Sequence, residues 1–137
     1  GEAEVAVERL TEAVKRGARD PETFHALGLA KMKLNDLKGA HEAYEHGVAA
    51  AAAKIDSLIG LATVALAEKN YAAALDAYDR ILLNEPTFAS AWLGRAYALI
   101  RLGRFEEATA SLNKAEALGA PKANVEKQRA LLRSSAP

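Results

Sequence analysis

The sequence repeats itself every 34 residues, and this period constrains the fold more than any other feature. When the chain is shifted by 34 positions, six columns of like residues come into register. The two clearest columns hold Ala6, Ala40, Ala74 and Ala108, and Leu10, Tyr44, Tyr78 and Leu112. A period of this length is typical of chains in which one supersecondary unit stacks on the next.

Within each period the apolar residues recur at three- and four-residue intervals, which indicates helix. Strict alternation is absent and β-branched residues are few, so strands are not expected. Asp20 and Pro21 mark one helix start, as N-cap and first helical residue. The weakest boundary is Ala49 to Lys54, because five consecutive Ala residues favour helix there. The pattern predicts eight helices, over 2–16, 22–34, 37–51, 55–68, 71–83, 88–102, 105–118 and 122–133.

Four segments carry recognisable motifs: Ala91-Trp92, the run from Leu102 to Ala108, Asn84-Glu85-Pro86 and the run from Phe24 to Gly28. In these segments the chain resembles the tetratricopeptide repeat (TPR) family. The resemblance implies an all-α fold, a right-handed α-α superhelix (solenoid) of antiparallel helix pairs. It predicts a single array over 1–137, with full repeats at 21–54, 55–88 and 89–122, the second helix of a truncated repeat at 1–20 and a capping helix at 123–137. Lys31, Arg95 and Ala52 depart from the family pattern, where a large aromatic, Leu and Pro are usual.

The first helix of each repeat carries a second apolar stripe that packing within the repeat does not explain. Its members follow i, i+4, i+7 spacing and therefore form one face. In the resembled architecture these helices line the concave surface, so we expect a partner-binding groove there. Its expected residues are His25, Leu29, Met32, Lys33, Asp56, Ile59, Thr63, Leu66, Leu93, Tyr97, Ile100 and Arg101, with Glu22 and Lys127 also at the rim. The alternative is that Leu29, Leu66 and Ile100 pack between adjacent first helices.

The amino-acid composition limits the classes of partner that we expect the chain to bind. Lys plus Arg and Asp plus Glu each number 18, and this zero net charge argues against binding to nucleic acid or to anionic membranes. No apolar run approaches the roughly 20 residues of a membrane span. Cys is absent, which excludes disulfides, thiolate zinc sites and a Cys nucleophile but leaves the compartment open. The chain opens inside an amphipathic stretch, so we expect it to be a piece of a longer protein.

The sequence gives little support for a catalytic site or a metal site. His41 with Glu45, and Glu42 with His46, have i, i+4 spacing, but such pairs usually form solvated surface. The Ser residues lack an elbow motif and the Gly residues form no phosphate-binding loop. We therefore expect no catalytic residue, no metal and no cofactor.

The prediction is a non-enzymatic scaffold that binds a protein or peptide with apolar anchors. The alternative is a homotypic assembly or regulatory module of a larger protein, and hence self-association. Some TPR proteins bind a terminal carboxylate with Lys, Asn and Arg. The matching columns here hold His25, Ala26, Leu29, Gly60 and Gly94, which argues against that specificity.

Overall fold

The computed structural model describes residues 1–50 and 55–137, and these residues form eight α-helices and no strand. The helices are α1 (Glu2–Lys15), α2 (Pro21–Lys33), α3 (Leu37–Ala50), α4 (Ile55–Ala67), α5 (Tyr71–Asn84), α6 (Ala89–Arg101), α7 (Phe105–Ala117) and α8 (Lys122–Ser135). Their ends lie within two residues of the predicted ones. Most of the predicted break at Ala49 to Lys54, together with the departure at Ala52, falls outside the described residues.

Short-range chemistry explains where the helices begin and end. The Asp20 carboxylate accepts the N–H of Thr23 at 2.8 Å and caps α2, whose first residue is Pro21. Gly103 has a φ of 76° after α6, and the N–H of Arg104 then reaches the carbonyl of Leu99 at 2.9 Å. This left-handed cap closes the last helical turn.

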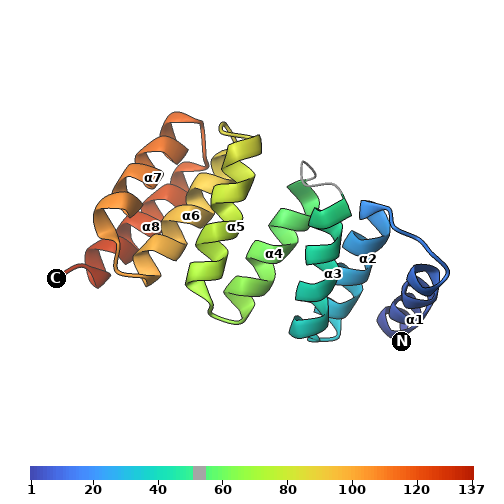
Figure 1. Ribbon diagram of the computed structural model, residues 1–137. Coiled ribbons are helices and arrows are strands. Elements are labelled where there is room, and N and C mark those ends of the chain that lie inside the picture. Colours follow the sequence, from blue (N-terminus) through green and yellow to red (C-terminus); the bar gives the residue numbers. More distant parts are fainter. Residues whose placement is uncertain (51–54) are drawn as a thin grey trace. The chain divides into compact units, whose positions relative to one another are not determined.

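The described helices fall into two compact units, residues 1–68 and 69–137. In the first unit, α2 packs against α1, α3 and α4, and α3 also contacts α4. In the second unit, α6 packs against α5, α7 and α8, and α7 also contacts α8. Figure 1 shows that consecutive helices within each unit run antiparallel. The boundary between the units lies inside the predicted repeat 55–88, and the prediction of a single array remains a prediction.

The columns of the 34-residue period form the cores of both units. Ala40, Ala74 and Ala108 have no exposed surface, and Tyr44 is 1% exposed. In the second unit, Leu112 and Val125 join Leu93, Ala96 and Ala115 in one buried cluster. Small residues in these columns allow helices to approach closely, and the larger neighbours fill the space beside them.

Arg95, which stands where the family usually has Leu, forms a polar link between three helices. Its Nε donates to Asp79 Oδ1 of α5 at 2.7 Å, and its Nη1 donates to Ser111 Oγ of α7 at 2.7 Å. Its guanidinium also lies 5.8 Å from the centre of the Trp92 ring. The Ser111 hydroxyl belongs to a residue with no exposed surface, so Arg95 satisfies a buried polar group.

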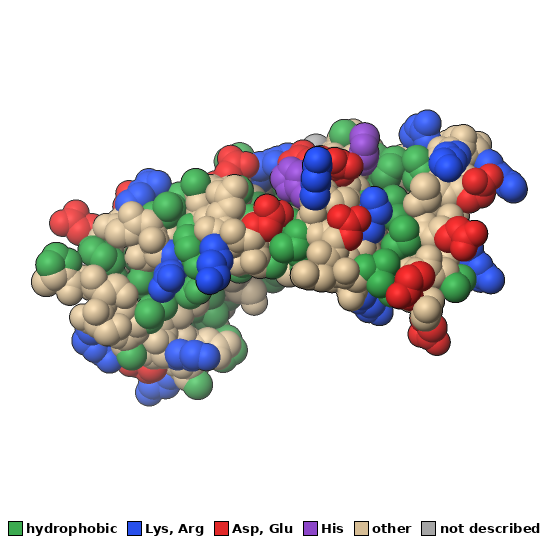
Figure 2. All heavy atoms as spheres, turned by 90° about the horizontal axis from the view of Figure 1, so that it is seen from below, with side chains coloured by type: hydrophobic (Ala, Val, Ile, Leu, Met, Phe, Trp, Pro, Cys, Tyr) green, Lys and Arg blue, Asp and Glu red, His purple; other side chains and the backbone are tan. Residues whose placement is uncertain are grey.

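Acidic and basic side chains are interspersed over the face of the molecule shown in Figure 2. This mixture accords with the equal numbers of the two charge types in the sequence. No large area of one sign is visible on that face.

Candidate partner-binding surfaces

In the first unit the predicted groove columns lie on α2 and α4, which pack against each other. We call Leu29, Met32, Ile59, Thr63 and Leu66 the α2–α4 face. Leu29 is 47% exposed and Ile59 is 38% exposed, whereas Met32 and Leu66 are half-buried. Thr63 is exposed, and its hydroxyl donates to the carbonyl of Ile59 at 2.9 Å. This face therefore presents aliphatic side chains to solvent.

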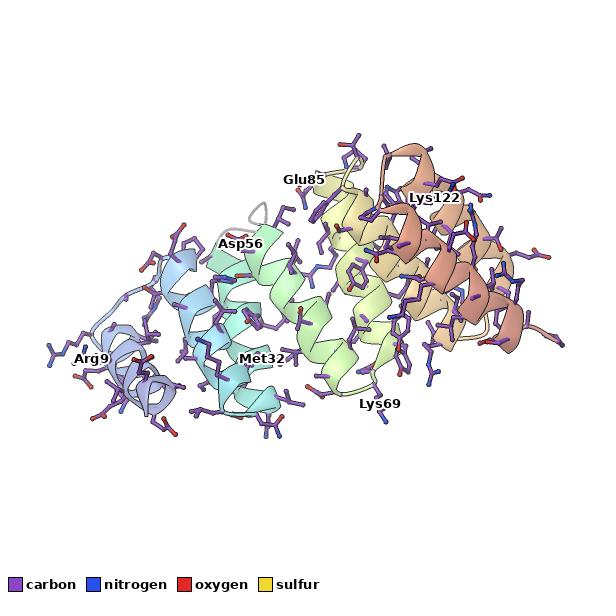
Figure 3. The ribbon with its side chains drawn as sticks, turned by 180° about the vertical axis from the view of Figure 1, so that it is seen from behind. Arg9, Met32, Asp56, Lys69, Glu85 and Lys122 are labelled. Atoms are coloured by element: carbon purple, nitrogen blue, oxygen red, sulfur yellow. The ribbon has the colours of Figure 1, made fainter. Side chains whose placement is uncertain are left out.

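The beginnings of α2 and α4 share a small pocket of about 80 Å³. His25 from α2 and Asp56 and Ser57 from α4 line it, together with Pro21 and Glu22. The His25 ring lies 5.8 Å from the ring of Tyr44. Figure 3 places Asp56 at the start of α4. The structure thus brings His25 and Asp56 together at one end of the α2–α4 face.

Met32 and Lys33 lie at the other end of α2, and Figure 3 labels the first of them. Lys33 is exposed. A partner that covered the whole α2–α4 face would therefore meet polar groups at both ends and aliphatic groups between them.

In the second unit, the residues of the same columns differ in exposure from those of the first unit. Ile100 is 3% exposed and Leu93 is 8% exposed, so both side chains contribute mainly to packing. Tyr97 is half-buried, and its ring meets Tyr71 edge-on with 6.0 Å between ring centres. Arg101 is exposed, with its guanidinium 5.3 Å from the centre of the Tyr71 ring.

A pocket of about 470 Å³ lies between α6 and α8, and we call it the α6–α8 pocket. It is lined by Leu93, Tyr97, Asn124, Lys127, Gln128 and Leu131. The sequence pattern predicts three of these residues as groove or rim residues but not Asn124, Gln128 and Leu131. The period held a signal for the last one, because Leu131 follows Tyr97 by 34 residues, just as Lys127 follows Leu93.

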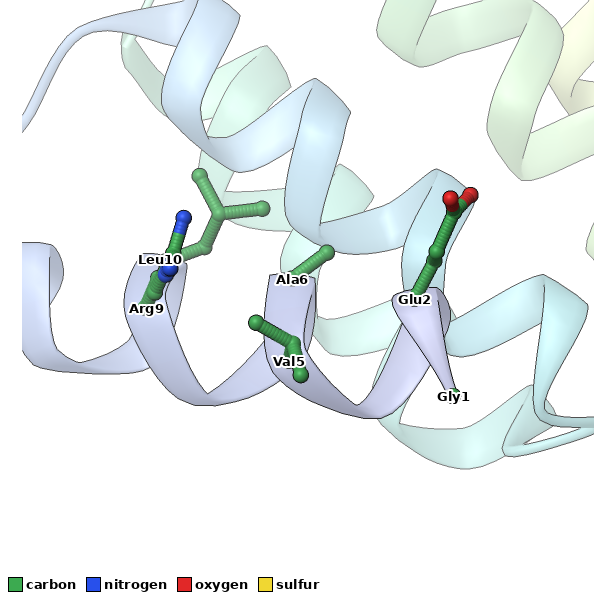
Figure 4. Close-up of a pocket in the computed structure, with 6 residues that line it drawn as sticks. All are labelled: Gly1, Glu2, Val5, Ala6, Arg9 and Leu10. Carbon is green, nitrogen blue, oxygen red and sulfur yellow. The ribbon is translucent and has the colours of Figure 1, made fainter.

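The surface of α1 is also open. Figure 4 shows Val5, Ala6 and Leu10 along this helix, with Glu2 and Arg9 beside them. Val5 is 45% exposed, and Ala6 and Leu10 are half-buried. Ala40 and Tyr44 follow Ala6 and Leu10 by 34 positions, and both are almost fully buried. The same columns are therefore covered by neighbouring helices in α3 but only partly covered in α1.

The family model for the tetratricopeptide repeat matches residues 25–85 and, in a second match that starts one period later, residues 59–123. The chain belongs to the tetratricopeptide repeat family. This match confirms the resemblance inferred from the sequence motifs. It spans α2 to α7, so the α2–α4 face lies on helices of recognised TPR sequence.

Solved TPR structures share the fold. A TPR protein from Parabacteroides merdae superposes with a TM-score of 0.90 at 19% identity, over 98% of this chain and 54% of that one. MamA gives a TM-score of 0.81 at 23% identity, over 86% of this chain and 64% of its own. YrrB, described as a TPR protein with an unusual peptide-binding site, gives 0.83 at 17% identity, over 94% and 66%. The all-α solenoid fold class predicted from the sequence is confirmed. No curated protein sequence matches the chain.

The structure also bears on metal binding and on membrane insertion by this TPR chain. Among residues 1–50 and 55–137, no three His, Asp or Glu side chains are grouped so that they could hold a metal ion. His41 Nε2 lies 3.8 Å from Glu45 Oε1, and both side chains are about half exposed. None of the described helices is long and apolar enough to cross a membrane.

Proposed function

We propose that this TPR chain is a non-enzymatic scaffold that holds a partner peptide or helix against the apolar faces of its first helices. The observation that carries the proposal is the exposure of Leu29 and Ile59 on two helices that pack together. Their neighbours Leu27 and Leu58 are buried, so α2 and α4 are apolar on two sides. Grouped aliphatic side chains in contact with solvent usually mark an interaction surface. The peptide-binding site named for YrrB supports the same kind of role.

The free energies involved suggest a modest affinity. Burying one aliphatic anchor contributes about 1.5–3 kcal/mol. Several anchors must together exceed the roughly 4–15 kcal/mol that association costs in lost freedom of motion. We therefore expect micromolar dissociation constants for a short partner segment.

A peptide display library tests the proposal. Peptides selected on the wild-type chain are measured against the Leu29→Glu and Ile59→Glu variants, and circular dichroism verifies that both variants fold. We expect both to lose binding, because a carboxylate would lie in an apolar contact. Leu83→Glu is the matched control, since Leu83 is 84% exposed on α5. Unchanged peptide binding by the folded Leu29→Glu and Ile59→Glu variants would contradict the proposal.

Self-association is a second candidate function, and the open surface of α1 favours it. Val5, Ala6 and Leu10 form a short apolar strip that a second copy of α1 could cover. Sedimentation velocity over a range of concentrations tests this. Dimers that disappear in Val5→Glu and persist in Leu83→Glu would support the candidate, and a monomer at every concentration would exclude it.

A further inference from the structure

A trough of about 320 Å³ lies over α2 in the first unit, and we call it the α1–α3 trough. Its walls come from α1 and α3, which both pack on neighbouring α2 or its ends (Figure 1). Phe24 and Leu27 of α2 form the floor and are 5% and 7% exposed. None of the described residues that line the trough belongs to the α2–α4 face. The volume is near the lower end of the range for small-molecule sites, so it suits one ring with a short substituent rather than a chain segment.

In the second unit, the protein's own side chains fill the corresponding space. The helices two periods after α1, α2 and α3 are α5, α6 and α7. Arg95 of α6 crosses this space, donates to Asp79 on one side and Ser111 on the other, and lies against the ring of Trp92. In the first unit, the residues at these four positions are Leu27, Thr11, Ala43 and Phe24. Leucine lacks both the length and the N–H donors of arginine, so the space between α1 and α3 stays open.

The open space has apolar and aromatic surfaces. Val14, Leu27 and Ala43 contribute aliphatic groups from all three helices. Phe24 stacks on His46 of α3 with 5.3 Å between ring centres and 27° between ring planes, and both residues line the trough. The group that fills the equivalent space in the second unit, the Arg95 guanidinium, is flat. An aromatic ring matches both the apolar surface and this flat shape.

The charges at the trough favour an anionic ligand. Among the described residues that line it, Arg19 and Lys31 are basic and Glu42 is the one acidic residue. Arg19 is exposed, and its Nη1 donates to the carbonyls of Val14 and Ala18 at 2.8 and 2.7 Å. These two bonds hold the guanidinium in place through one nitrogen. Its Nε and Nη2 carry further N–H groups that suit a carboxylate.

These groups define one kind of ligand. We infer that the α1–α3 trough binds a free aromatic carboxylate, whose ring lies against Val14, Leu27 and Phe24 and whose carboxylate pairs with the Arg19 guanidinium. Lys31 Nζ lies 4.0 Å from Asp36 Oδ2, so Lys31 is already near an anion and adds only a weaker attraction. The site does not depend on the proposed peptide-binding function, because the two surfaces share no residue.

Three small probes separate the contributions of charge and ring. The first is 3-phenylpropionate, the second is its neutral amide, and the third is 3-cyclohexylpropionate. Each is titrated into the isotopically labelled chain, and amide NMR signals are followed. We expect 3-phenylpropionate to shift the signals of Thr11, Leu27 and Ala43, with a dissociation constant on the order of 1 mM. The amide should bind about threefold to tenfold more weakly, and the cyclohexyl probe about twofold to tenfold more weakly.

The same ring and carboxylate also occur at the end of a protein chain that terminates in phenylalanine. The peptide acetyl-Gly-Gly-Phe, with a free carboxylate, represents that source. We expect it to bind more weakly than 3-phenylpropionate, because the small trough has no room for the attached backbone. Tighter binding by the peptide would overturn the assignment to a free small molecule.

Variants of Arg19 test the ion pair. Arg19→Gln should bring the preference for 3-phenylpropionate over its amide close to one, whereas Arg19→Lys should retain much of it. Arg16→Gln is the matched control, since Arg16 is an exposed cation that does not line the trough and pairs with Glu12. Equal loss of preference in Arg16→Gln and Arg19→Gln would show a general effect of charge and would overturn the assigned pair.

Filling the trough tests its location. The triple variant Thr11→Asp, Leu27→Arg and Ala43→Ser reproduces the link that Arg95 makes in the second unit, and it should abolish binding of 3-phenylpropionate. Circular dichroism verifies its fold. Thr11→Phe provides a second blocking variant, because Thr11 is only half-buried and its position lines the trough. Undiminished binding by a folded blocking variant, or equal binding of 3-phenylpropionate and its amide by the wild-type chain, would overturn the inference.

Discussion

The ring of Tyr44 occupies the space that a side chain at Gly28 would need. A Cβ atom placed on Gly28 would come within 2.5 Å of Tyr44 Cε1, closer than carbon atoms tolerate. A Cβ atom placed on Gly60 of α4 would come as close to the same ring atoms. Tyr44 of α3 therefore packs against two glycines, one on each of the helices that carry the α2–α4 face. Burial also raises the pKa of its phenol.

Gly28→Ala and Gly60→Ala should each destabilise the chain, although Ala favours helix over Gly by about 1 kcal/mol. The added methyl group must displace a buried ring, and overpacking of this kind costs typically 1–3 kcal/mol. We expect a net loss for each variant in urea unfolding. Tyr44→Leu, which mimics Leu112 of the same column, should reduce the additional cost of Gly28→Ala. An undiminished cost in that background would show that the ring is not the obstacle.

Arg95→Ala should destabilise the second unit by about 1–3 kcal/mol, because Ser111 loses its donor while it stays buried. Adding Ser111→Ala should recover part of this loss, since the unsatisfied hydroxyl is then absent. Urea unfolding of the two single variants and the double variant measures the coupling. Strict additivity would mean that the link between Arg95 and Ser111 contributes nothing.

Asp20 gives the chain a defined response to acid. Hydrogen bonds from the hydroxyl and N–H of Thr23 hold the pKa of Asp20 below its usual value. Its contribution to stability is complete above the unfolded-state pKa and is lost as pH falls through the lower folded-state pKa. Asp20→Asn keeps a capping acceptor without the titration, so its melting temperature should fall less steeply below pH of about 4. The melting temperatures of both chains, measured as a function of pH, check this prediction. An equally steep fall in the two chains would contradict it.

Leu112→Ala should cost about 2–5 kcal/mol in urea unfolding, because the side chain is 1% exposed and a cavity would remain. Leu83→Ala removes the same atoms from a side chain that is 84% exposed and should change stability by no more than about 0.5 kcal/mol. Similar losses in the two variants would contradict the burial pattern described above.

Local interactions made much of this fold predictable. The helix that starts at Pro21 and the turn at Gly103 depend on residues within a few positions of one another, and both were found where the sequence placed them. The 34-residue period likewise placed Ala40, Ala74 and Ala108 in one column, and all three are fully buried. Caps, turns and helical faces could be predicted because each follows from a short stretch of chain.

Exposure within a column was decided only by tertiary structure. His25, Ile59 and Leu93 occupy one column, yet Ile59 is 38% exposed and Leu93 is 8% exposed. The α6–α8 pocket also arises only when two helices that are separated in sequence come together. The period fixes which way a side chain points, but the accessible area depends on the shapes of residues that other helices bring against it. That dependence on non-local neighbours is why the sequence determined the family and the helices, while the packed structure decided which surfaces remain open.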